Sequence, residues 1–108
     1  MNFTESEKAA IAKILLEMIN IDDHIDDRES ILMFNITNNL QITDEDIESA
    51  KRMHPITCFH TISKMGPEKK AVLVVSMHEL MSADNVIKPE EMKFFNDVCN
   101  IGNIKFDF

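Results

Sequence analysis

Two short acidic segments contain the side chains best suited to chemistry, and that chemistry is binding a metal ion. The first segment reads DDHIDDRE over residues 22–29, and the second reads DNVIKPEE over residues 84–91. Carboxylate oxygens are hard ligands of the kind that Ca²⁺, Mg²⁺ and Mn²⁺ prefer. If the segments met, their carboxylates would surround one cation, and without a cation or protons they would repel one another. The candidate metal ligands are the first and last residues of both segments: Asp22, Glu29, Asp84 and Glu91.

A competing interpretation explains the two glutamates without a metal. Glu29 and Glu91 both fall at the third position of an expected helix, where a glutamate reaches back to the N-cap backbone. Asp26 is the expected N-cap in the first segment, and a first-turn aspartate favours the positive end of the helix dipole. Asp22 and Asp84 precede the caps and have no capping role, so the metal hypothesis depends most on these two residues.

The acidic segments do not follow the EF-hand pattern. An EF-hand loop that began at Asp22 would need glycine at its sixth position and glutamate at its twelfth. Asp27 and Met33 stand there instead, and the second segment fails as well.

The two segments occupy the same place in an internal repeat. Adding 62 to a residue number in the first half finds the same residue type in the second half at many positions, without a gap. The repeat units cover about residues 5–42 and 67–104, and each contains the pattern D-x-x-I-x-x-x-E. Neither unit can bury its own apolar face, so we expect the two to pack about an approximate two-fold axis. The identical pairs are Lys8/Lys70, Ala9/Ala71, Glu17/Glu79, Asp22/Asp84, Ile25/Ile87, Glu29/Glu91, Asn38/Asn100 and Ile42/Ile104.

Apolar residues recur at helical spacing almost throughout, which predicts an all-α protein. Thr4 and Glu7 form an expected capping box before the first helix, and Thr43 is an expected N-cap further on. The sequence His54-Pro55 predicts a break between helices. Helices are expected over residues 5–20, from about residue 27 to 40, and over residues 44–53, 56–65, 67–82 and 89–100. The fifth is apolar on nearly all sides, so we expect it to be central and buried.

Length and charge narrow the class of protein. The 108 residues suit a single helical domain over residues 1–108, and the two cysteines form no disulfide framework. A net charge of −8 argues against nucleic acid and anionic membranes as partners, and permits cations or basic partners. The longest apolar run, Ala71–Val75, is too short to cross a bilayer. Without a secretory signal pattern, we expect a cytoplasmic monomer or homodimer with an unidentified protein partner.

No other motif offers stronger chemistry. His54, Cys58 and His60 lie within HPITCFH, which is not a recognised zinc spacing and lacks an evident fourth ligand. Two glycines cannot build a phosphate-binding or dinucleotide-binding loop, and no nucleophile elbow occurs. We therefore expect no enzymatic activity and no cofactor other than a divalent cation.

The stretches ILLEMINIDDHIDDRESILMF and HELMSADNVIKPEEMKFF resemble the tellurite-resistance TerB-like family. The resemblance extends over about residues 5–104 and implies an all-α fold with cation-binding acidic positions at Asp22, Glu29, Asp84 and Glu91. It also implies a link to metal or oxyanion stress, or use as an interaction module. The family usually has glycine directly after the loop aspartate, where this chain has Asp23 and Asn85.

Two functional hypotheses follow. In the first, the chain is a cytosolic, TerB-like, stress-associated protein that binds a divalent cation. In the second, it is a protein–protein interaction module in which the acidic residues only cap helices.

Overall fold

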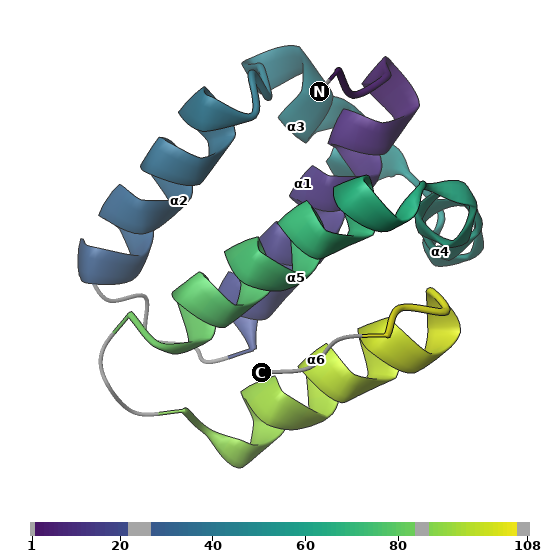
Figure 1. Cartoon of the computed structure of the whole chain (residues 1–108). Helices are drawn as coiled ribbons and strands as arrows, with labels where there is room; N and C mark the ends of the chain where they lie inside the picture. Colours follow the sequence, from purple (N-terminus) through teal and green to yellow (C-terminus); the bar gives the residue numbers. More distant parts are fainter. Residues whose placement is uncertain (1, 22–26, 84–86, 106–108) are drawn as a thin grey trace.

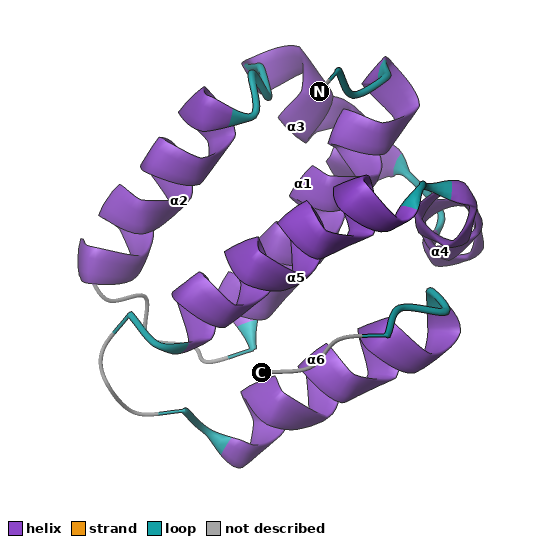
Figure 2. Ribbon diagram, in the orientation of Figure 1, coloured by secondary structure: helices purple, strands orange, loops and turns teal. Residues whose placement is uncertain are grey.

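The computed structural model describes residues 2–21, 27–83 and 87–105, and within these ranges it contains helices and no strand. The all-α fold class expected from the sequence is therefore confirmed (Figure 2). The molecule measures 31 × 30 × 25 Å along its principal axes. The helices are α1 (Glu5–Asn20), α2 (Asp27–Asn39), α3 (Asp44–Arg52), α4 (Pro55–Lys64), α5 (Pro67–Met81) and α6 (Pro89–Ile101).

Capping boxes begin α1 and α3. The Thr4 hydroxyl accepts the Glu7 N–H at 3.1 Å, and Glu7 Oε1 accepts the Thr4 N–H at 2.8 Å. At α3, Thr43 and Asp46 make the reciprocal pair at 3.2 and 2.9 Å. Both expected N-caps are confirmed, and each satisfies backbone N–H groups that the first helical turn leaves free. The expected cap Asp26 lies outside the described residues.

Proline and histidine fix the start of α4. Pro55 occupies the first helical position, where its missing N–H costs nothing, and the helix starts one residue earlier than the pattern predicted. His54 is the N-cap, and its Nδ1 accepts the Ile56 N–H at 3.1 Å.

Helix α1 lies at the centre of the fold and contacts each of the other described helices (Figure 1). Its face toward α3 and α4 contains short side chains, and Ala10 and Ala12 are fully buried. This lets α4 approach so closely that the Cys58 thiol donates to the Ala10 carbonyl at 3.4 Å.

The expectation that the fifth helix would be central was only partly right. Helix α5 packs beside α1 but leaves Val75 49% exposed, because α3 and α4 cover α1 and not α5.

Helices α2 and α6 end in the same kind of turn. Gln41 and Asn103 follow them with φ angles of 58° and 55°. The next residue closes each turn: the Ile42 N–H donates to the Thr37 carbonyl, and the Ile104 N–H donates to the Cys99 carbonyl, both at 2.8 Å. This is the Schellman pattern, with a buried isoleucine just beyond the left-handed residue.

The two helix pairs also coincide in their bounds. Shifting α2 by 62 residues gives the bounds of α6, and the same shift places α1 over α5 to within one residue at the C-terminal end. Each of α2 and α6 contacts both α1 and α5. No described helix combines the length and apolar character needed to cross a membrane.

Candidate functional site

The structure describes two of the four candidate metal ligands. Glu29 and Glu91 are the third residues of α2 and α6, as the sequence predicted. They are 8% and 7% exposed, and no other described carboxylate residue is buried to that degree. Asp22 and Asp84 lie outside the described residues, so their convergence with the glutamates stays a prediction.

Burial of a carboxylate is costly unless other groups compensate its charge. Neither Glu29 nor Glu91 is without a partner. Each also lies in the first turn of its helix, where the helix dipole favours a negative charge. The two glutamates therefore share a helix position and a degree of burial, and both features are compatible with capping and with cation binding.

The helix ends that position these glutamates lie on one side of the molecule in Figure 1. The C-terminal ends of α1 and α5 and the N-terminal ends of α2 and α6 all point toward the lower left of that view. Because α1 and α5 are in contact, and α2 and α6 each contact both, the paired central helices hold the two glutamate-bearing helices.

Histidines and cysteines do not add metal ligands in the described ranges. Over residues 2–21, 27–83 and 87–105, no group of three or more His, Cys, Asp or Glu side chains is arranged to hold a metal ion. In the HPITCFH segment, His54 caps α4, Cys58 is buried against α1, and His60 is exposed. Among the described residues, the structure does not assemble these three side chains into a metal site.

The two cysteine thiols are buried and have raised pKa values. Burial raises the pKa of Cys58 to about 12, the nearby Glu17 carboxylate adds to the shift, and Lys13 partly opposes it. Burial also raises the pKa of Cys99 to about 11. Since the thiolate is the reactive form, neither cysteine is a nucleophile near neutral pH.

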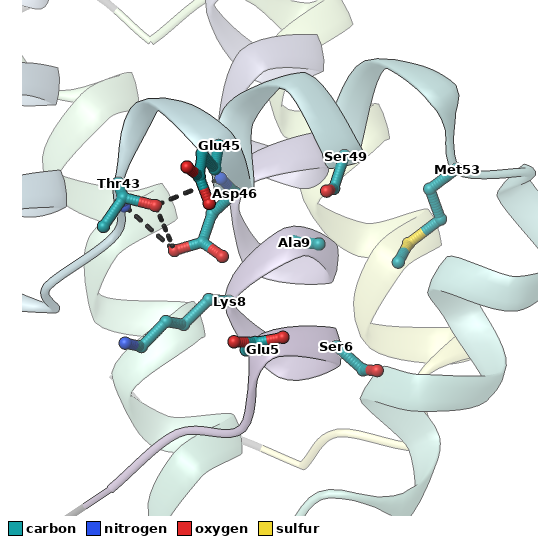
Figure 3. A pocket seen from close by; sticks show the side chains of 9 residues that line it. All are labelled: Glu5, Ser6, Lys8, Ala9, Thr43, Glu45, Asp46, Ser49 and Met53. Carbon is teal, nitrogen blue, oxygen red and sulfur yellow. Dashed lines mark hydrogen bonds between the residues drawn. The ribbon is translucent and has the colours of Figure 1, made fainter.

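A polar hollow of about 410 Å³ lies between the N-terminal part of α1 and the length of α3 (Figure 3). The side chains of Glu45 and Asp46 on α3 face Glu5 and Lys8 on α1 across it. The Asp46 carboxylate already accepts the Thr43 N–H in the capping box of α3. Sequence reasoning missed this hollow because it joins two helices, and the only local signal is the acidic start of α3. Its lining mixes both signs of charge with the hydroxyls of Ser6, Thr43 and Ser49.

The fold is similar to that of PG1108, a protein of unknown function from Porphyromonas gingivalis W83 known from a crystal structure. The TM-score is 0.83 at 19% sequence identity, and the match covers 99% of this chain and 90% of that one. At this identity the likeness supports the helical fold alone. Neither a protein-family model nor a curated protein matches this chain. The resemblance to the TerB-like family stays a prediction.

Proposed function

We propose that this chain is a non-enzymatic, TerB-like, stress-associated cytoplasmic protein that binds a divalent cation through Asp22, Glu29, Asp84 and Glu91. The observation that supports it is the equal burial of Glu29 and Glu91 at the starts of α2 and α6. The acids that complete the capping boxes of α1 and α3, Glu7 and Asp46, are only partly buried. Two buried carboxylates at the same place in two halves suit a shared positive ligand better than two independent caps.

The cytoplasmic location is part of the same proposal. Both cysteines are free and buried. Free thiols persist in a reducing compartment, whereas secreted domains of this size commonly use cysteines as disulfides.

The test separates capping from cation binding through the choice of substitution. Glutamine at the third helical position still accepts the N-cap N–H, but it removes the anionic charge that a divalent cation needs. We expect the E29Q/E91Q variant to fold normally and to bind Mn²⁺ or Ca²⁺ at least tenfold more weakly in calorimetric titrations. We expect D22N/D84N to lose a similar factor, since those residues have no capping role.

A matched control removes two negative charges elsewhere. Glu45 and Glu48 are exposed on α3, and E45Q/E48Q lowers the net negative charge by the same amount. We expect this variant to bind the cation as the unmodified chain does. If wild-type protein shows no saturable binding of Ca²⁺, Mg²⁺ or Mn²⁺, or if the control loses as much affinity as E29Q/E91Q, the cation proposal is wrong.

A second candidate function has its own observation. Ile31 and Phe34 are 63% and 69% exposed on the side of α2 opposite Ile36, which is buried in the core. Large exposed apolar side chains on one helix face often mark a protein interface. The interaction-module hypothesis predicts that Ile31→Ser with Phe34→Ser lowers concentration-dependent self-association in sedimentation experiments and leaves cation binding unchanged. Sedimentation that is independent of concentration in the unmodified chain would exclude a homodimer through this face.

A further inference from the structure

An ion pair joins equivalent positions of the two helix pairs. Lys69 Nζ on α5 lies 2.7 Å from Glu7 Oε1 on α1, and the two side chains are 25% and 13% exposed. The two residues are 62 positions apart, which is the offset that relates the bounds of α2 to those of α6. Position 7 in the first half therefore touches its own counterpart in the second half.

A contact between equivalent positions of two related halves lies at the axis that relates those halves. A residue meets its own equivalent only where the two-fold axis passes, as in a dimer with an isologous interface. In a dimer of identical units the two side chains at the axis would carry the same charge. Here a glutamate and a lysine stand there, and opposite charges meet.

We infer that the Glu7–Lys69 pair selects how the halves of this chain pair with one another. Within one chain, the first half packs on the second, and the pair is attractive. Two copies could instead associate by joining first half to first half and second half to second half. That arrangement brings Glu7 to Glu7 and Lys69 to Lys69, and like charges in a partly buried contact oppose it. The pair thus favours the closed monomer over a dimer that joins like halves.

The surroundings of the pair hold both charges in place. Burial by itself raises the pKa of Glu7, but hydrogen bonds from Lys69 and from the Thr4 backbone outweigh it and hold that pKa below its ordinary value. Lys69 Nζ also lies 5.6 Å from the centre of the Phe3 ring. The Glu7 carboxylate therefore stays charged near neutral pH.

Two variants with opposite charge changes give the sharpest test. Glu7→Lys places two lysines at the axis, and Lys69→Glu places two glutamates there. Each variant alone brings like charges together within its chain. When the two are unfolded in urea, mixed in equal amounts and refolded, a dimer with one copy of each restores opposite charges at both contacts. We expect native mass spectrometry to show a severalfold excess of this mixed dimer over the dimers of either variant alone.

A control uses an ion pair that lies within one helix. Lys93 and Asp97 on α6 are 2.8 Å apart and 79% and 50% exposed, so K93E and D97K change charge without touching the α1–α5 contact. Their mixture is expected to remain monomeric. An equal excess of mixed dimer in this control, or no excess with the axis variants, overturns the inference.

Two double variants test the inference even if the single variants fail to fold. One removes both charges of the Glu7–Lys69 pair, and the other exchanges them. E7Q/K69Q removes the discrimination, so its dimer fraction after refolding at high concentration should rise severalfold. E7K/K69E restores the attraction and should return the chain to the wild-type monomer fraction. A neutral variant as monomeric as the wild type, or an exchanged pair as dimeric as the neutral one, contradicts the inference.

Discussion

The two helix pairs, α1–α2 and α5–α6, have matching bounds and different surroundings. Helix α2 buries only Glu29 and Ile36 among its described residues, whereas α6 buries Glu91 together with an apolar row. The difference comes from α4, which contacts α6 and makes no comparable contact with α2 in the described part of the chain. Matching backbone signals therefore did not give matching cores, because α4 packs on α6 and not comparably on α2. The apolar row on α6 is Phe95, Val98 and Cys99.

The largest expected effect compares Phe95 with its counterpart Met33. Phe95 is 2% exposed, while Met33 is only half-buried. Phe95→Ala leaves a cavity in the core and should lower the free energy of unfolding by about 3–5 kcal/mol, and Met33→Ala by about 1–2 kcal/mol. Urea unfolding measures both. Equal losses would mean that α2 is as firmly packed as α6.

The next effect concerns the ends of the two helices, where Leu40 stands after α2 and Gly102 after α6. A Cβ at Gly102 would lie 2.9 Å from the Val98 carbonyl oxygen and 3.0 Å from Ile62 Cγ2 of α4. Gly102→Ala should therefore destabilise the protein by about 1–3 kcal/mol in urea unfolding. A Cβ at Gly66 would meet no such neighbour within 4 Å, so Gly66→Ala is the control and should cost clearly less. A tolerated Gly102→Ala would show that α4 can move away from α6.

A smaller effect tests the charges at the contact of α1 with α5. The lowered pKa of Glu7 means that its contribution to stability is complete above the ordinary glutamate range and is lost as the pH falls through the folded-state value. Glu7→Gln should cost about 1 kcal/mol at pH 7, and the difference from wild type should close as the pH falls below the lowered pKa of Glu7. Urea unfolding across this pH range measures it.

The control for Glu7 is a glutamate in an exposed pair. Glu48 lies 3.2 Å from Lys51, and both side chains are 58% exposed. Glu48→Gln should change stability by less than about 0.5 kcal/mol at any pH, because exposed ion pairs contribute little. A gap between wild type and Glu7→Gln that persists in acid would show that packing, and not charge, accounts for the Glu7 effect.

The smallest effect compares the two left-handed residues. Gln41 and Asn103 both have positive φ angles, and asparagine tolerates that conformation better than glutamine. Gln41→Gly should stabilise the chain by about 0.5–1 kcal/mol, and Asn103→Gly by less. Thermal or urea unfolding of both variants checks the order. A larger gain at position 103 would contradict it.

The local signals of the sequence determined the helices and their ends. Capping boxes at Thr4 and Thr43 and prolines at the first positions of α4, α5 and α6 act over a few residues, so they can be read without knowing the fold. The same signals placed Glu29 and Glu91 at the third positions of their helices. The candidate site was predicted to that extent, and its two aspartates stay a prediction.

The tertiary structure decided which helices pack together and which side chains they bury, because local sequence signals act over only a few residues. It made α1 the central helix, because the alanines of α1 admit α3 and α4 while α5 has no such cover among the described helices. It buried Glu29 and Glu91 equally, and it brought Glu7 onto Lys69 across the contact of α1 with α5. Burial and long-range pairing depend on which helices become neighbours, and that choice minimises exposed apolar surface over the whole chain. The sequence by itself thus determined the elements and the positions of the acidic side chains, and the packing of the helices decided which charges are enclosed and which meet.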